Sequence, residues 1–323
     1  MNPTAVISRR REHAGDTKSP STWRRSALRR APVTKRGAHQ WTRAPRNERS
    51  DELAAQVGRR LNGASGTLAA SVLFDSGIEH YVGAFHNPAM ITPLITAAAS
   101  LAASLHGVAD RRPAAHRFRD TVYAAAALAG CAGTAFHLYN ITKRPGGLCW
   151  QNLFYAAPVG APMAMLLSGS LGFLAERVRD TDAHEDPKIL GLPAGRTLAA
   201  ATSAGIAGTV GEAALLHFRG AFQNPLMLAP VTIPPVAAAL LGRASLDSSD
   251  RARPFTRWWL RLTAALGFLG VGLHVFGVHR QMGGWRNWRQ NVMSGPPIPA
   301  PPSFTGLAIA GLAALTLLES RGE

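Results

Sequence analysis

Four histidines at matched spacings are the side chains in this sequence that are best suited to do chemistry. They are His80, His137, His217 and His274, and each lies near the end of an apolar segment. His80 and His217 are 137 residues apart, and so are His137 and His274. A neutral imidazole ligates haem iron or a transition metal, and it exchanges protons near neutral pH. The histidines are therefore the first candidates for a cofactor or metal site.

Two acids follow the same spacing. Asp75 and Glu212 both lie inside apolar segments, five residues before His80 and His217. Five residues turn a helix by about 140°, so an acid and the following histidine do not share a face. An ionisable group at membrane depth costs several kcal/mol unless it is paired or hydrated. We therefore expect Asp75 and Glu212 to act in a proton or ion relay.

Small residues precede two of the histidines in a repeated pattern, Gly-x-x-Gly-x-x-x-His. The first copy contains Gly130 and Gly133, and the second contains Gly267 and Gly270. Glycines at these positions would allow a flat macrocycle to approach the helix, although they also serve ordinary helix packing. Together with the histidines they form the expected cofactor-binding set.

Three chemistries suit these residues, and their spacing does not choose among them. The first is haem b held between opposed histidines. The second is a quinone or proton site in which imidazoles and carboxylates exchange protons. The third is a transition-metal site made by His80, His137, His217 and His274. A further alternative is a scaffold whose histidines only cap helix ends or bond to neighbouring helices.

Eight apolar segments must position these side chains. They are 64–82, 91–109, 120–141, 153–175, 197–217, 225–242, 257–279 and 303–319. At about 1.5 Å per residue each segment is long enough for a hydrocarbon layer of ~30 Å. The sequence predicts an all-α polytopic membrane protein with eight transmembrane helices. A soluble enzyme and a nucleic-acid-binding protein are improbable despite the net charge of +16.

An internal duplication organises the eight segments. Residues 83–93 and 220–230 both contain Gly-Ala-Phe-x-Asn-Pro, a turn signal, and a short insertion later aligns Pro158 and Pro162 with Pro297 and Pro301. Each unit holds four helices, so both enter the membrane in the same direction. We expect two tandem four-helix units of the same orientation, residues 64–180 and 197–323.

Basic residues predict the orientation. Residues 1–63 are rich in arginine and poor in apolar runs, which predicts a disordered cytoplasmic tail. Outside the tail, Lys and Arg are concentrated in the loops around 110–119, 176–196 and 243–261. The positive-inside rule then predicts an inner-membrane protein with both termini in the cytoplasm and the four histidines near the outer face.

Two functions of different classes follow from these features. One is a redox subunit that binds haem b or quinone near the extracytoplasmic face. Its partners would be the lipid bilayer and an extracytoplasmic dehydrogenase or another subunit, docked on the outer Trp and Arg residues around 285–291. The other is a small-solute or metal-ion transporter with a path between the two bundles, lined by Asp75 and Glu212.

Overall fold

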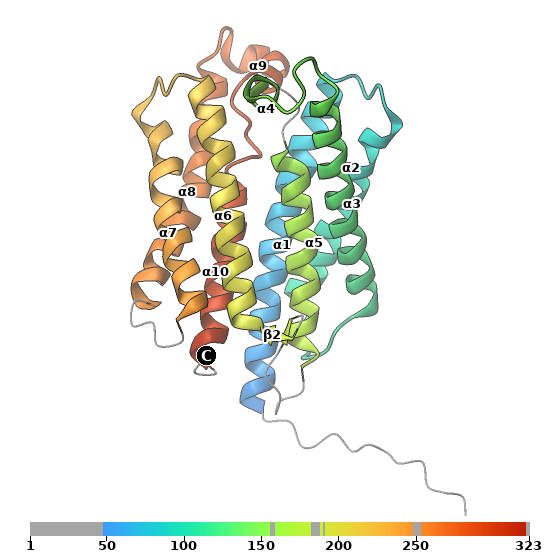
Figure 1. Ribbon diagram of the computed structural model, residues 1–323, viewed down its shortest axis with the longest axis vertical. Helices are drawn as coiled ribbons and strands as arrows, with labels where there is room; N and C mark the ends of the chain where they lie inside the picture. Colours follow the sequence, from blue (N-terminus) through green and yellow to red (C-terminus); the bar gives the residue numbers. More distant parts are fainter. Residues whose placement is uncertain (1–47, 156–158, 182–187, 190, 248–252, 321–323) are drawn as a thin grey trace, which may run out of the picture. The chain divides into compact units, whose positions relative to one another are not determined.

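The computed structural model describes residues 48–155, 159–181, 188–189, 191–247 and 253–320, and most of them are helical (Figure 1). The long α-helices are α1 (Glu48–Val82), α2 (Thr92–Ala109), α3 (Arg117–Thr142), α5 (Gly160–Arg179), α6 (Ala194–Arg219), α7 (Ala229–Leu246), α8 (Arg253–His279) and α10 (Pro302–Ser320). The short elements are η1 (Pro88–Ile91), α4 (Trp150–Tyr155), η2 (Pro225–Leu228), η3 (Gly284–Asn287) and α9 (Trp288–Ser294). Strands β1 (Lys188–Ile189) and β2 (Leu192–Pro193) form a small antiparallel pair.

Six of the long helices in the described residues are long and apolar enough to cross a membrane. They are α3, α6, α8 and α10, together with α2 and α7 extended by the preceding η1 and η2 turns. Large apolar side chains project outward from them, such as Leu128 of α3 and Phe268 of α8, each 71% exposed. Contiguous apolar surface on this scale is typical of contact with lipid. The protein is thus an all-α protein with the helices of a membrane protein.

Helices α1 and α5 do not meet this apolar criterion, because their buried faces carry polar side chains. Ser65, Ser71 and Ser76 of α1 are buried, as are Ser168 and Glu176 of α5. The hydroxyls bond across the helices: Ser65 Oγ donates to the carbonyl oxygen of Ser168 at 2.8 Å, and Ser168 Oγ donates to that of Ser65 at 2.9 Å. Both helices pack against other helices, which supply the partners that hydrocarbon lacks.

The helices pack in two sets with the same order of neighbours. In the first set α1 contacts α2 and α5, and α3 contacts α2 and α5. In the second set α6 contacts α7 and α10, and α8 contacts α7 and α10. Figure 1 shows the second set on the left and the first on the right. The main contact between the sets joins α1 to α10, and both helices contribute to the largest apolar core.

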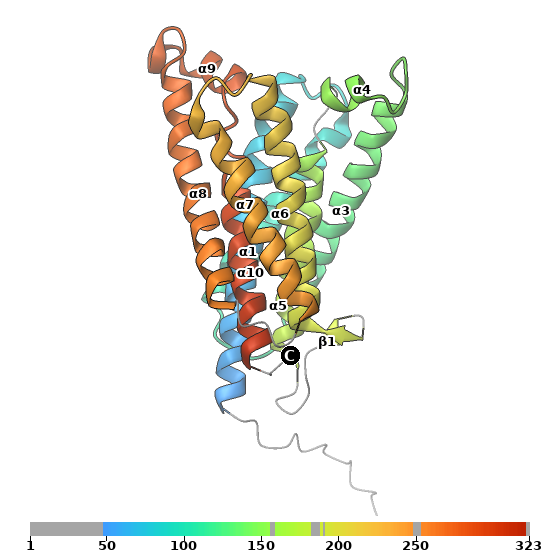
Figure 2. The ribbon, with the colours of Figure 1, turned by 60° about the vertical axis from the view of Figure 1, so that its left-hand side comes forward.

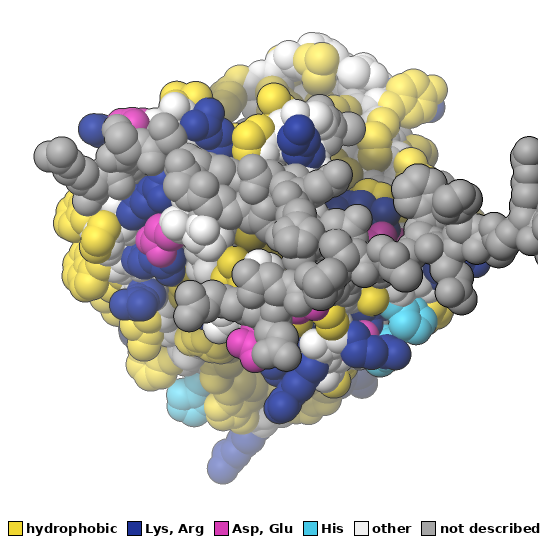
Figure 3. Space-filling view, turned by 90° about the horizontal axis from the view of Figure 1, so that it is seen from below, with side chains coloured by type: hydrophobic (Ala, Val, Ile, Leu, Met, Phe, Trp, Pro, Cys, Tyr) yellow, Lys and Arg dark blue, Asp and Glu magenta, His cyan; other side chains and the backbone are white. Residues whose placement is uncertain are grey.

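The two ends of the helices differ in character. The hairpins around 83–91 and 220–228 lie at one end together with α4 and α9, and we call this the hairpin end (Figure 2). The other end holds the start of α1, the β1–β2 pair and the end of α10, and we call it the basic end (Figure 2). Figure 3 shows Lys and Arg side chains across the basic end and apolar side chains along its flanks.

Helix α1 begins earlier than the sequence predicts. Residues 48–63 were expected to continue the disordered tail, but they are the first turns of α1. The reason is an apolar stripe at helical spacing, Leu53, Val57 and Leu61, of which the last two are fully buried in the main core. The arginines between them obscure this stripe in a hydropathy reading. Residues 1–47 of the expected tail lie outside the described part.

Candidate functional site at the hairpin end

The hairpins fix two of the four histidines in the same way. His80 Nδ1 donates to the carbonyl oxygen of Met90 at 2.6 Å, and His217 Nδ1 donates to that of Met227 at 2.8 Å. Each acceptor lies ten residues after its histidine, in the 3₁₀ turn that opens the next helix. The histidine therefore joins the end of one helix to the start of its neighbour.

The hairpin backbone explains why the two sites match. Ala84 and Phe85 have φ angles of 56° and 47°, and Ala221 and Phe222 have 53° and 46°. The side chain of Asn87 then caps η1 through the N–H of Ala89. The side chain of Asn224 caps η2 through Leu226 N–H in the same way. The turn predicted from Gly-Ala-Phe-x-Asn-Pro is thus formed at both places.

The other two histidines lie on α8 and α3. His274 Nδ1 donates to the carbonyl oxygen of Pro297 at 2.7 Å, in the segment between α9 and α10. His217 lies close enough to His274 for the charge on one ring to act on the other. His137, at the matching place on α3, is half-buried and also has an interaction partner. His217 and His274 therefore lie within electrostatic reach of each other in the second set of helices.

The carbonyl partners determine the protonation of the rings. A carbonyl oxygen only accepts, so Nδ1 of His80, His217 and His274 carries the proton. In the neutral ring, Nε2 is then left with its lone pair. This tautomer is the one that presents Nε2 to a metal, or to a ligand that donates a hydrogen bond.

The two acids lie on helices of different sets. Asp75 of α1 and Glu212 of α6 are half-buried and close enough to interact electrostatically. The backbone N–H of Gly160, the first residue of α5, donates to the Glu212 carboxylate. The third acid of this region, Glu79, is exposed. The two acids therefore lie near enough for their charges to interact, whereas the rings of His80, His217 and His274 are held by backbone carbonyls.

The four glycines that were expected to line a cofactor slot are in contact with neighbouring segments of the chain. The Cα of Gly130 lies against the backbone of Pro162 and Leu166 in α5, and Gly133 lies against the Pro162 ring. Gly267 and Gly270 meet Pro301 of the α9–α10 segment in the same way, and Gly267 also meets Thr305 of α10. A neighbouring helix therefore occupies the space that a macrocycle along α3 or α8 would need.

His80, His137, His217 and His274 were also expected as metal ligands. Within the described residues, no group of three or more His, Cys, Asp or Glu side chains is placed to hold a metal ion. The hairpin end thus holds three imidazoles whose Nδ1 atoms donate to backbone carbonyls, and the region also contains the Asp75–Glu212 pair.

A buried ion cluster at the basic end was not predicted. Arg119 donates from Nε and Nη2 to the two carboxylate oxygens of Glu176, each at 2.8 Å, and from Nη1 to Asp110 at 2.8 Å. Arg179 donates to Asn62 Oδ1 at 3.1 Å and to backbone carbonyls. Arg119, Arg179 and Glu176 are fully buried. The only sequence signal was the Glu176–Arg179 spacing of three residues on one helix.

Among the described residues of the second set of helices there is no such cluster. The register that aligns Pro162 with Pro301 places Leu315 and Leu318 at the positions of Glu176 and Arg179. Both leucines are buried in the apolar core. A four-helix set of this kind therefore packs without buried charges, and the ion cluster distinguishes the first set from the second.

The chain was also compared with known proteins. No protein-family model matches it, and comparisons with curated proteins and with solved structures gave no match.

Proposed function

We propose that this chain is an integral membrane redox protein that binds a quinone at the hairpin end. The observation that carries the proposal is the tautomer of His80, His217 and His274, whose Nδ1 protons are held by backbone carbonyls. The free Nε2 lone pair accepts a hydrogen bond from a quinol hydroxyl, and after protonation it returns the proton to a quinone oxygen. The Asp75–Glu212 pair of α1 and α6 provides a second proton store.

Haem b is the less favoured cofactor. A haem between two of these helices needs a slot for its flat ring, and Gly130, Gly133, Gly267 and Gly270 were its expected lining. Those glycines are in contact with α5 and the α9–α10 segment. A quinone headgroup is smaller and needs hydrogen-bonding side chains only. The available side chains therefore fit a quinone better.

Reduction of a bound quinone needs two electrons and two protons, and the product is a quinol. The imidazoles and the carboxylate pair supply protons, while the electrons come from a partner. We propose an extracytoplasmic dehydrogenase as that partner. Its docking surface is the exposed aromatic and basic side chains of the hairpin end, including Trp285, Arg286, Trp288 and Arg289.

We further propose that all eight long helices span the inner membrane, as two tandem four-helix units of the same orientation with cytoplasmic termini. Three observations support this topology. The two sets of helices share their order of contacts, the two hairpins share their dihedral angles, and the Gly130 and Gly267 contacts follow the same register. Lys and Arg at the basic end favour its placement in the cytoplasm.

The test of function is to quantify quinone and haem in protein purified from membranes. We expect bound quinone in the wild type and at least about a tenfold lower content in the His217→Ala/His274→Ala variant. His279→Ala is the matched control, because His279 is an exposed histidine on the same helix as His274. A Soret absorption band would show that the bound cofactor is haem and would contradict the quinone assignment. Absence of both cofactors from the wild type would reject the redox proposal.

A transporter is the second candidate, and the Asp75–Glu212 pair favours it. Its members lie on α1 and α6, which belong to different sets, as expected for a path between two bundles. Ion or solute flux into vesicles should then fall in Asp75→Asn/Glu212→Gln. Flux should be unchanged in Glu79→Gln, which removes an exposed acid one turn from Asp75. Equal flux in all three proteins would reject transport through this pair.

A further inference from the structure

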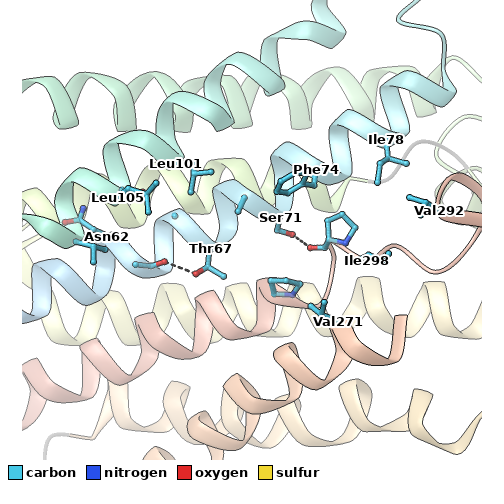
Figure 4. A pocket seen from close by; sticks show the side chains of 17 residues that line it. Asn62, Thr67, Ser71, Phe74, Ile78, Leu101, Leu105, Val271, Val292 and Ile298 are labelled. Atoms are coloured by element: carbon cyan, nitrogen blue, oxygen red, sulfur yellow. Dashed lines mark hydrogen bonds between the residues drawn. The ribbon is translucent and has the colours of Figure 1, made fainter. Parts of the chain in front are cut away.

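An apolar groove of about 660 Å³ runs along α1 between the two sets of helices. Its floor is formed by small residues of α1, Gly63, Gly66 and Ala70, and continues to Phe74 and Ile78. One wall carries Leu101, Leu105 and Val108 of α2 (Figure 4). The other wall carries Val271 of α8 and residues between α9 and α10, including Ile298 and Pro299.

The groove has the dimensions of a lipid chain. From Gly63 to Ile78, α1 rises about 22 Å, more than the ~15 Å depth of one leaflet. Its volume lies within the ~300–1,000 Å³ range of sites that hold small ligands. The polar side chains that line it are already engaged within the protein. Asn62 donates to Tyr123 Oη, Thr67 to the Gly63 carbonyl and Ser71 to the Pro299 carbonyl (Figure 4).

Two arginines stand at the end of the groove nearest the basic end. Arg59 and Arg60 precede Gly63 by one turn, on the same face of α1. Arg59 Nε donates to the Val108 carbonyl on the α2 wall at 2.6 Å, and Arg60 Nη1 donates to Thr316 Oγ1 of α10 at 3.1 Å. The two side chains therefore flank the groove. In the described part of the chain, neither has an acidic side chain within ion-pair distance.

We propose that this groove binds an anionic phospholipid from the leaflet at the basic end. The acyl chain lies along Gly63, Ala70 and Phe74, and the phosphate lies between Arg59 and Arg60. Arginines beside the end of an apolar groove are suited to acidic headgroups. Uncharged occupants, such as a quinone tail or an apolar helix, would leave both guanidinium groups without a counter-charge. The proposed phosphate position and the proposed quinone site lie at opposite ends of the helices, whereas the apolar end of the groove, at Ile78 and Ile298, adjoins His80 and Pro297 in the sequence.

Native mass spectrometry of the full chain in detergent micelles tests the proposal. The probes are phosphatidylglycerol and phosphatidylcholine with identical acyl chains. We expect the wild type to prefer phosphatidylglycerol by about tenfold or more, and Arg59→Gln/Arg60→Gln to lose that preference. Arg59→Lys/Arg60→Lys keeps both charges and should retain most of it. Ala70→Phe fills the floor of the groove and should weaken binding of both lipids.

The matched control is Arg111→Gln/Arg117→Gln, which removes two exposed charges at the same end, outside the groove. It should bind phosphatidylglycerol as the wild type does. The proposal is overturned if the wild type does not prefer phosphatidylglycerol over phosphatidylcholine. It is also overturned if the control variant loses as much of that preference as Arg59→Gln/Arg60→Gln does. Displacement of the lipid by millimolar inorganic phosphate would also overturn it, because the site would then recognise phosphate without the chain. Thermal unfolding of each variant, measured in parallel, separates loss of binding from loss of folding.

Discussion

The carboxylate of Glu212 in α6 accepts a hydrogen bond from the backbone N–H of Gly160, the first residue of α5. The contact joins the two sets of helices at the hairpin end. It satisfies one of the free N–H groups of a helix start and places a negative charge at the positive end of the helix dipole. The matching position in the second set is Pro299, which has no N–H. Asp75, the counterpart of Glu212, therefore has no equivalent backbone donor at that position.

Gly160→Ala should destabilise the protein. A Cβ at residue 160 would overlap the Glu212 carboxylate, so we expect a loss of about 1–3 kcal/mol in the free energy of unfolding. Thermal unfolding in detergent measures it. Gly208→Ala is the control, because nothing lies near its Cβ position. In a Glu212→Ala background the cost of Gly160→Ala should largely disappear, and an unchanged cost there would contradict the contact.

Removal of one member of the buried ion cluster should be severe. Glu176→Leu leaves Arg119 buried with one carboxylate partner, Asp110, and brings a loss of about 3–5 kcal/mol. The exposed pair of Arg257 and Glu319 offers a comparison, since Glu319→Leu should cost at most about 1 kcal/mol. Chemical denaturation of both variants measures the difference. Equal losses of unfolding free energy in the two variants would mean that burial does not determine how much these ion pairs contribute to stability.

The stability of the protein should depend on acid through Asp110, which follows the last residue of α2. Hydrogen bonds from Arg112 and Arg119 hold the pKa of its carboxyl well below the usual range, although burial opposes them. A depressed folded-state pKa adds stability above the unfolded pKa of about 4, and that stability is lost as the pH falls toward the folded value. Between these two pKa values the free energy of unfolding of the wild type falls as the pH falls. We expect Asp110→Asn to reduce this dependence by about 1.4 kcal/mol per pH unit.

The measurement is the midpoint of denaturant unfolding between pH 7 and pH 2. The difference between wild type and Asp110→Asn should be largest near pH 7 and should shrink below pH 4. A constant difference across this range would show that Asp110 does not stay ionised through its arginine contacts.

The two hairpins should respond equally to the same substitution. Ala84 and Ala221 both have left-handed backbone conformations, which cost an L-residue with a Cβ about 1–2 kcal/mol. Ala84→Gly and Ala221→Gly should therefore each raise the free energy of unfolding, by about 1 kcal/mol and by similar amounts. Thermal unfolding of the two single variants and the double variant tests this. Clearly unequal effects would contradict the structural equivalence of the hairpins.

The expected helices were largely correct, because hydropathy and turn chemistry are local properties. Each of the eight apolar segments corresponds to a long helix, although the segment 153–175 is shifted to 160–179 in α5. The Asn-Pro turns are formed where they were predicted, because Asn87 and Asn224 cap helices whose first residue is proline. The start of α1 was missed because arginines lie between the apolar residues of its buried stripe. They lower the mean hydropathy of the segment, so that it resembles a loop.

The placement of side chains between distant segments required the tertiary structure. Whether Gly130 lines a slot or touches Pro162 depends on where α5 lies, and no spacing within α3 contains that information. The pairing of Arg119 with Glu176 joins helices 57 residues apart, and Arg60 meets Thr316 across 256 residues. Periodicity specifies which face of a helix is apolar, but burial of a charge is favourable only where a partner is supplied. The partners of these groups come from other helices, so packing alone decided which polar residues are buried and which flank the groove.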